Sequence, residues 1–213
     1  MRTVVLDRDM IEGEVKPHDL VAEYRRLLDE DVRERLVEGL VHCCCPGCRA
    51  EDAGEAFIRS SLQYLHCNIC SSLYVSPRPG EEALASFYRD ARSVVFWQEK
   101  ILPTTREARR EKIYRPRAQW LMDVVDEYRP LTERCVVVGY HNELLVEELL
   151  NQVEEPFAIV VTNPSADIEF AEAQLPGVTV QPMAISRIGD LGQVDLLLAF
   201  DILDRCADPE ALF

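Results

Sequence analysis

Four cysteines in two closely spaced pairs are the residues of this sequence best suited to chemistry. Cys45 and Cys48 enclose a Pro-Gly pair, Cys67 and Cys70 enclose an Asn-Ile pair, and eighteen residues separate the two motifs. Thiolates at this spacing are soft ligands that can close a tetrahedral shell around a zinc ion. Because four thiolates leave no position for a water molecule, the pattern predicts structural rather than catalytic zinc.

Other interpretations of the cysteines are weaker. A redox Cys-x-x-Cys motif normally stands alone after a strand, whereas this chain has two such motifs. Disulfides need an oxidising compartment, and residues 1–10 do not read as a signal peptide, so we expect reduced thiols in a cytoplasmic protein. Cys135 and Cys206 are expected in the core as buried free thiols. Four further residues crowd the site and could replace a ligand, although a flanking role is favoured: His42, Cys43, Cys44 and His66.

The composition of the chain disfavours two classes of partner. Of its 213 residues, 47% are hydrophobic and 29% are charged, which is typical of soluble globular proteins. The net charge of −15 opposes binding to nucleic-acid phosphates and to anionic membranes. No apolar run reaches the length that spans a bilayer. We therefore expect no nucleic-acid or membrane partner, and a nucleic-acid-binding ribbon is a distant alternative.

The elements that must position the cysteines follow from the spacing of apolar residues. Residues 17–37 carry apolar side chains at intervals of three and four, which predicts a helix. Short strands are expected at 56–58 and 62–65, between the cysteine pairs, and at 73–75 after the second pair. Two knuckles joined by strands form a zinc ribbon. Its core is small, so we expect the metal to supply much of its folding free energy.

The rest of the chain divides into a helical connector and an α/β segment. Residues 81–88 and 104–128 are helix-like, and Pro116 is expected to split or kink the second stretch. Beyond it, continuous apolar strands alternate with helices, which predicts a parallel sheet covered on both faces. The expected order is strand 135–139, helix 143–150, strand 157–161, helix 165–175, strand 178–180 and strand 194–200.

Two features of the connector could serve either a structural or a functional role. Its six basic residues between 106 and 117 could bind a phosphate or an acidic partner. Glu107 and Glu111 interleave with them, which favours a solvated, salt-bridged helix. Phe96 and Trp97 could line a pocket or a partner surface, although packing in the core is the default expectation.

The order of these features resembles the class I S-adenosylmethionine-dependent methyltransferases that carry an N-terminal zinc ribbon. The resemblance spans roughly residues 20–213. It rests on the ribbon, on Tyr-Val-Ser-Pro-Arg-Pro at 74–79 before a helix ending in Phe87-Tyr88, and on Asp201-Ile-Leu-Asp with Asp208-Pro209 after the fourth strand. It implies an α/β protein, namely a truncated Rossmann-like methyltransferase core preceded by a helix and a zinc ribbon. The implied divisions are a helical segment 1–41, a zinc ribbon 42–80, a connector 81–130 and a partial Rossmann-like domain 131–213.

The residues that would bind the cofactor in that family are altered in this sequence. Of the glycine-rich turn after the first strand only Gly139 remains, with His141 and Glu143 at the next two glycine positions. Asn163 stands where an acid would bind the ribose hydroxyls. His141 could act as a general base, although an ordinary loop histidine is the favoured interpretation. If S-adenosylmethionine binds, the resemblance places four residues around it: Gly139, His141, Asn163 and Met183.

These alterations lead to two hypotheses about function. The sequence ends at Phe213, after the fourth of the family's roughly seven strands, so an apolar sheet edge is expected to be covered by a protein partner, by self-association or by a longer chain. The first hypothesis is a zinc-binding, methyltransferase-like protein that acts as a non-catalytic scaffold or partner subunit, because methyl transfer needs a well-positioned cofactor. The alternative is an S-adenosylmethionine-dependent methyltransferase of a small molecule or sugar, complete only in a longer chain or a complex.

Overall fold

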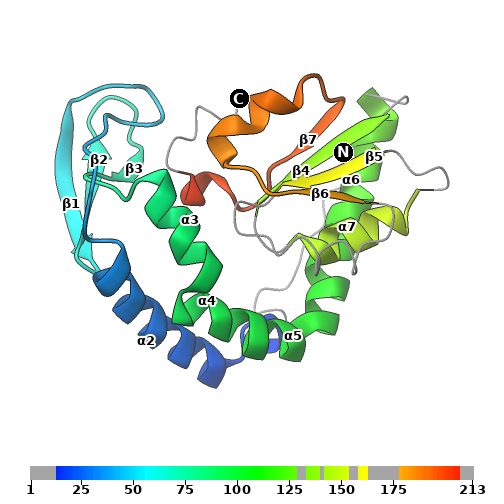
Figure 1. Cartoon of the computed structure of the whole chain (residues 1–213), viewed down its shortest axis with the longest axis horizontal. Helices are drawn as coiled ribbons and strands as arrows, with labels where there is room; N and C mark the ends of the chain where they lie inside the picture. The colour runs from blue at the N-terminus through cyan, green and yellow to red at the C-terminus, as the bar shows by residue number, and fades with distance from the viewer. Residues whose placement is uncertain (1–12, 129–132, 140–141, 154–157, 163–177, 207–213) are drawn as a thin grey trace.

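Two β-sheets joined by a series of helices make up the structure, a computed structural model that describes residues 13–128, 133–139, 142–153, 158–162 and 178–206. Figure 1 shows the antiparallel sheet at one end and the parallel sheet at the other, with the helices forming an arc along the lower rim. Within the described residues, no helix has both the length and the apolar composition needed to cross a membrane.

The N-terminal helix and the antiparallel sheet agree with the sequence-based expectation. Helix α2 (His18–Arg35) starts after Pro17, whose carbonyl accepts a hydrogen bond from the N–H of Val21. Gly39 follows the helix at φ +62°, in the left-handed region that favours glycine. The antiparallel sheet has the order β1-β2-β3. Its strands are β1 (Ala53–Arg59), β2 (Leu62–Cys67) and β3 (Leu73–Val75). We call this sheet and its two cysteine loops the ribbon.

The connector is helical from residue 81 to residue 128, with a short break at Ala91. Its elements are α3 (Glu81–Asp90), α4 (Arg92–Phe96), a π-helical turn (Trp97–Ile101), α5 (Leu102–Arg109), a second π-helical turn (Arg110–Tyr114) and α6 (Arg115–Tyr128). The sequence predicted that Pro116 would split or kink this stretch, and the structure shows no split, because α6 continues through the proline. A π-helical turn, which is a common site of helix bending, ends at Tyr114 two residues before Pro116 and accommodates the proline ring and its missing N–H donor.

The second sheet is parallel, as predicted, and has the order β6-β5-β4-β7. Its strands are β4 (Arg134–Val138), β5 (Ala158–Thr162), β6 (Thr179–Gln181) and β7 (Leu196–Leu198). Helix α7 (Glu143–Leu150) connects β4 to β5. Successive strands are added on opposite sides of β4: β5 and β6 extend the sheet on one side, and β7 pairs with β4 on the other. The strand order therefore reverses at β4, although all strands run parallel. The helix expected over 165–175 lies outside the described residues.

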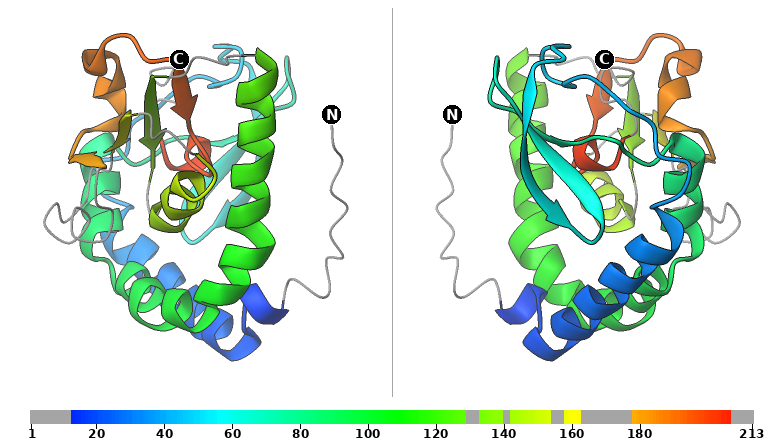
Figure 2. Two further views of the ribbon diagram at one scale, coloured as in Figure 1. Left: turned by 90° about the vertical axis from the view of Figure 1, so that its right-hand side faces the viewer. Right: turned by 90° about the vertical axis from the view of Figure 1, so that its left-hand side faces the viewer.

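Alternate residues of β4 face two different hydrophobic clusters, which explains why the strand is apolar throughout. Cys135 and Val137 pack with residues of α6 and α7. Val136 and Val138 pack on the opposite face against residues of the 3₁₀ helix Ile185–Leu191. Figure 2 shows these elements on either side of the sheet. The sheet is therefore covered on both faces, as the continuous apolar strands predicted.

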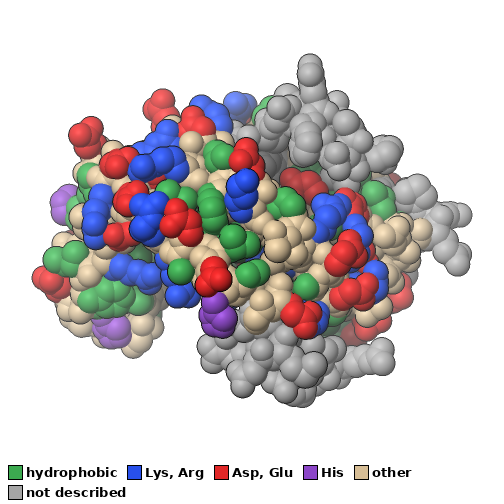
Figure 3. All heavy atoms as spheres, turned by 90° about the horizontal axis from the view of Figure 1, so that it is seen from below, with side chains coloured by type: hydrophobic (Ala, Val, Ile, Leu, Met, Phe, Trp, Pro, Cys, Tyr) green, Lys and Arg blue, Asp and Glu red, His purple; other side chains and the backbone are tan. Residues whose placement is uncertain are grey.

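Five of the six basic residues between 106 and 117 contact carboxylates, as their interleaving with acidic residues indicated, whereas the buried Arg109 donates to the Val15 carbonyl and the Thr105 hydroxyl. Figure 3 shows basic and acidic side chains intermixed over the face of the molecule seen from below. Part of the pairing spans distant parts of the chain, which the sequence did not indicate: Arg106 contacts Glu147 of α7 at 2.6 Å, and Arg115 contacts the buried Glu148 at 3.1 Å. These ion pairs join the connector to the parallel sheet's covering helix.

Candidate metal centre

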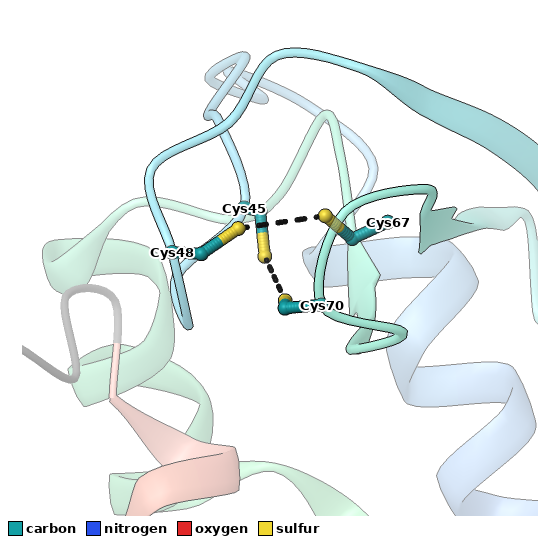
Figure 4. Close-up of side chains that lie close together, drawn as sticks. All are labelled: Cys45, Cys48, Cys67 and Cys70. Carbon is teal, nitrogen blue, oxygen red and sulfur yellow. Dashed lines mark hydrogen bonds between the residues drawn. The ribbon is translucent and has the colours of Figure 1, made fainter.

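The structure brings the four cysteines of the two motifs into one cluster. Their sulfur atoms all lie within 4.8 Å of one another (Figure 4). Across the two loops, the Sγ atoms of Cys45 and Cys70 are 3.5 Å apart, and those of Cys48 and Cys67 are 3.6 Å apart. Cys45 and Cys67 are completely buried, whereas Cys48 and Cys70 lie at the surface. Each loop therefore contributes one buried and one accessible ligand.

The two cysteine loops have the same backbone geometry. In the first, the N–H of Arg49 donates to the carbonyl of Cys45, and the N–H of Cys45 donates to the carbonyl of Ala50. In the second, the same two hydrogen bonds link Ser71 to Cys67 and Cys67 to Ser72. Arg49 and Ser71 both have positive φ values, +62° and +64°. These tight turns point the two sulfur atoms of each loop in the same direction, so two equivalent turns facing each other form the cluster.

Gly47 allows the two loops to approach closely. A Cβ atom at this position would lie 2.7 Å from the Oγ of Ser72 and 3.6 Å from the Sγ of Cys70. Since carbon and oxygen atoms without a bond do not approach to 2.7 Å, a larger residue here would displace the Ser72 hydroxyl, which contacts the Sγ of Cys70 at 3.1 Å. Ser72 carried no signal of this role in the sequence, although it holds the same position in its loop as Ala50 does in the first.

Hydrogen-bond donors favour the thiolate form of two of the four cysteines, Cys45 and Cys70. Burial raises the pKa of Cys45, but the backbone N–H groups of Gly47 and Cys48 outweigh this and lower its pKa below the ordinary value. The hydroxyl and N–H of Ser72 lower the pKa of Cys70 to about 6. The pKa of Cys48 moves the other way, to about 12, because the N–H of Ala50 cannot offset the effect of the neighbouring thiols.

The donor set fits a single metal ion. Four thiolates at a zinc–sulfur distance of about 2.3 Å place the sulfur atoms about 3.8 Å apart, close to the observed 3.5 and 3.6 Å. A disulfide would need about 2.05 Å, and all four cysteines are free. Four thiolates this close repel one another, and a divalent cation removes that repulsion. Thiolate ligands select zinc or iron over magnesium or calcium.

The residues that crowd the cluster do not join it. His42 and His66 are exposed, and the Sγ of Cys43 faces the carbonyl of Val75 at 3.5 Å. Among the described residues, only the four motif cysteines form a metal-sized group of potential ligands. Cys135 and Cys206 are buried in the two clusters of the parallel sheet, as expected. Burial raises the pKa of Cys135 to about 12, so its thiol is inert at neutral pH.

The residues that the resemblance places around a cofactor are not seen together. His141 and Asn163 lie outside the described residues. Gly139 follows β4 at φ +132°, a conformation suited to glycine. Met183 is partly buried and packs against the cluster that contains Val136 and Val138. Gly139 follows β4 and Met183 follows β6, with β5 between these strands.

The space beside Gly139 is filled by side chains of this protein. A Cβ atom at Gly139 would lie 3.1 Å from the Nδ2 of Asn142 and 3.5 Å from the Cδ1 of Ile202. Ile202 is fully buried and Asn142 is 7% exposed. The Nδ2 of Asn142 is itself buried without a hydrogen-bond partner in the part of the chain that the structure describes. The side of Gly139 to which a Cβ would point is therefore closely packed by Asn142 and Ile202.

Comparisons with known proteins gave no match: the chain matches no protein-family model, no curated protein and no solved structure.

Proposed function

We propose that the four cysteines hold one structural zinc ion in a methyltransferase-like protein that acts as a non-catalytic scaffold or partner subunit. The observation that carries this proposal is the cluster of four sulfur atoms within 4.8 Å of one another. The residues fit zinc by number, by type and by separation. When bound, the zinc ion supplies four bonds that tie the two loops together, and Cys45, Cys48, Cys67 and Cys70 hold it.

A structural role for the zinc is supported by the small core of the ribbon. Apart from the buried ligands Cys45 and Cys67, the cluster of buried residues in the ribbon contains one large side chain, Tyr74. So small a core buries too little apolar area to fold stably alone, and a bound metal offsets this deficit. Four thiolate ligands also leave no site for a reacting water molecule.

The methyltransferase-like part of the proposal is supported by the parallel sheet. Its order β6-β5-β4-β7 reverses at β4, and in doubly wound α/β proteins ligands bind at the carboxyl ends of the strands at such a reversal. Gly139, at the carboxyl end of β4, has the backbone conformation that a turn close to a cofactor requires. The division of the chain at residues 41, 80 and 130 is part of the same proposal.

A non-catalytic role is supported by the packing after β4. Asn142 and Ile202 pack where a Cβ of Gly139 would point. The family that the sequence resembles carries an acid at the end of the first strand, and this chain has the buried Val137 at that position. Strand β7 lies at one edge of the described sheet, with Leu196 and Leu197 partly accessible. An accessible apolar edge strand is suited to pairing with another chain, which is the role that we propose for it.

Metal analysis of the purified protein tests the zinc centre. We expect one equivalent of zinc by mass spectrometry of the ashed protein, and loss of the ribbon's protection from hydrogen exchange after chelation. Cys67→Ser should remove most of the zinc. Cys43→Ser is the matched control, because Cys43 neighbours the site but faces Val75, and it should retain one equivalent. Less than half an equivalent in the unaltered protein after refolding with excess zinc would contradict the proposal.

Calorimetric titration with S-adenosylmethionine tests the non-catalytic role. In protein that carries one equivalent of zinc, we expect no binding at millimolar cofactor, because Asn142 and Ile202 pack closely beside Gly139. Micromolar binding would contradict a non-catalytic role and favour the alternative, a methyltransferase of a small molecule or sugar.

A further inference from the structure

A groove separate from the metal centre lies where four distant parts of the chain meet. It has a volume of about 500 Å³, within the range of pockets that bind small molecules. Its walls come from α2, from the turn between β1 and β2, from the α3–α4 region and from the 3₁₀ turn Leu203–Arg205. None of the four cluster cysteines lines it.

Aromatic side chains form much of the wall of the groove. The rings of Tyr24 and Trp97 lie 5.1 Å apart with their planes tilted by 60°. Phe87 and Tyr88, on consecutive positions of α3, meet edge to face at 5.4 Å. Tyr64 of β2 also lines the groove. Such walls suit a flat ring, which can stack on one aromatic face and meet the edge of another.

Three guanidinium groups in the groove have no acidic partner in the described part of the chain. They belong to Arg25, Arg59 and Arg205, whereas most arginines on the helices around them contact carboxylates. The acidic residue that lines the groove, Asp29, has both oxygens engaged: one accepts from the hydroxyl of Ser60 at 2.6 Å and the other contacts Arg33 at 2.7 Å. The groove is thus locally positive, although the chain carries a net charge of −15.

Arg205 lies over one of the aromatic rings of the groove. Its guanidinium carbon lies 5.6 Å from the centre of the Tyr88 ring. Burial raises the pKa of the Tyr24 hydroxyl, and the charge of Arg205 partly opposes this rise. An arginine stacked on a ring keeps its N–H donors free at its edge, and those donors match a carboxylate or a phosphate.

We propose that this groove binds a small aromatic anion, a compound with a flat ring and one carboxylate or phosphate group. The ring would lie against Tyr24, Tyr88 and Trp97, and the anionic group would take hydrogen bonds from the arginines. Pairing of unneutralised guanidinium groups with an anion gives strong, charge-assisted hydrogen bonds. Neutral ligands of the same shape would leave these donors without partners.

Calorimetry with four simple compounds tests the proposal in zinc-loaded, full-length protein. The probes are 2-naphthoate and 2-naphthyl phosphate. The controls are 2-naphthamide, which is flat but neutral, and cyclohexanecarboxylate, which is anionic but not flat. We expect saturable binding of at least one probe, roughly tenfold tighter than either control, and weaker binding at high salt. The stronger probe identifies the anionic group. Binding of the stronger probe no tighter than that of 2-naphthamide, or no binding of either probe, would overturn the proposal.

Charge-removing variants test whether binding takes place in the groove. Arg205→Gln and Arg25→Gln should each weaken the better probe by about fivefold or more, since each removes a charged donor. Arg89→Gln is the matched control, because Arg89 is an exposed arginine of α3 outside the groove, and it should leave affinity unchanged. Melting curves verify that Arg205→Gln is folded, and the exposed Arg25 provides a second variant if it is not. An equal loss in Arg89→Gln would overturn binding in the groove in favour of a general charge effect.

Discussion

The carboxylate of Asp31 in α2 accepts a hydrogen bond of 2.6 Å from the backbone N–H of Ser93, at the start of α4. Asp31 is 1% exposed, and its other oxygen accepts from the Nε of Arg92 at 2.8 Å. The Asp31 side chain therefore caps a helix that lies 62 residues later in the chain. Without this contact, the first turn of α4 would lose a hydrogen-bond partner for a buried N–H.

Removing this buried cap should destabilise the protein. We expect Asp31→Ala to reduce the free energy of unfolding by about 2 kcal/mol, the size of a charged hydrogen bond with a buried partner left unpaired. Glu34→Gln is the matched control: Glu34 also contacts Arg92 at 2.8 Å but is 62% exposed, so its loss should cost no more than about 0.5 kcal/mol. Urea denaturation measures both. Equal effects would show that Arg92, rather than the buried cap, is the stabilising element.

The contribution of Asp31 should depend on pH in a defined direction. Burial raises the pKa of Asp31, but hydrogen bonds from Ser93 and Arg92 outweigh it, so the pKa in the folded state lies below the ordinary value. A carboxylate with a lowered pKa stabilises the fold above its unfolded pKa of about 3.9, and this contribution is lost as the pH falls through the folded pKa. The difference in stability between the unaltered protein and Asp31→Asn should therefore be constant at neutral pH and shrink below about pH 4. A constant difference down to pH 2 would contradict this assignment.

Gly47→Ala should weaken metal binding through a collision between the loops. Its Cβ would lie 2.7 Å from the Oγ of Ser72. We expect zinc affinity to fall by roughly tenfold, the size of effect seen when residues that orient metal ligands are mutated. Gly54→Ala is the matched control, since a Cβ there has no atom within 4 Å. Competition with a chromogenic chelator measures the affinities.

A double variant identifies the cause of this loss. Adding Ser72→Ala to Gly47→Ala removes the oxygen that the new Cβ would meet, so part of the lost affinity should return. If the double variant binds zinc more weakly than the sum of the single effects predicts, the collision is not the cause.

Immediately after metal removal, before the ribbon loses its protection from hydrogen exchange, the cluster should show unequal thiol reactivity. In the folded loops at pH 7 the thiol of Cys70, with a pKa of about 6, is mostly ionised, whereas Cys48, with a pKa of about 12, is not. Because the thiolate is the nucleophile, a short pulse of iodoacetamide should modify Cys70 well before Cys48, and mass spectrometry of peptides resolves the two sites. Ser72→Ala should slow the reaction of Cys70 by removing the hydroxyl donor. Equal rates at both cysteines while the hydrogen-exchange protection persists would contradict the difference in pKa.

Glu143→Gln should stabilise the protein at neutral pH. Burial raises the pKa of Glu143, the first residue of α7, and the nearby Glu147 adds to this effect. A carboxyl group with a raised pKa favours the fold in its protonated form and opposes it once ionised, so the variant should melt at a higher temperature at pH 8 and show little gain at pH 4. Glu147→Gln should have the opposite sign, since Glu147 contacts Arg106 and Arg110. A lower melting temperature for Glu143→Gln at pH 8 would contradict the argument.

Local patterns were sufficient to predict the metal cluster and most elements. The Cys-x-x-Cys spacing specifies a tight turn, and each turn forms from hydrogen bonds between residues at most five positions apart, such as Cys45 and Ala50. The apolar run at β4 likewise implied a strand buried on both faces, since every side chain in it needed apolar neighbours. Pro116 indicated a local disturbance of the helix, but the sequence did not show that the helix would continue through it, because the π-helical turn before the proline depends on the helical residues on either side.

Tertiary structure alone decided the contacts between residues far apart in the chain. No periodicity relates Asp31 to Ser93, Gly47 to Ser72, or Glu147 to Arg106, because each pair depends on how whole elements pack. The groove is the clearest case. Arg25, Arg59 and Arg205 look like ordinary surface charges in the sequence, and they line one cavity only because α2, the ribbon and the turn after β7 meet there. The sequence by itself determined where a metal can bind, because the cysteine loops are turns formed by residues close together in the chain. Only the tertiary structure decided the groove, because its walls come from residues far apart in the chain whose packing cannot be inferred from local patterns.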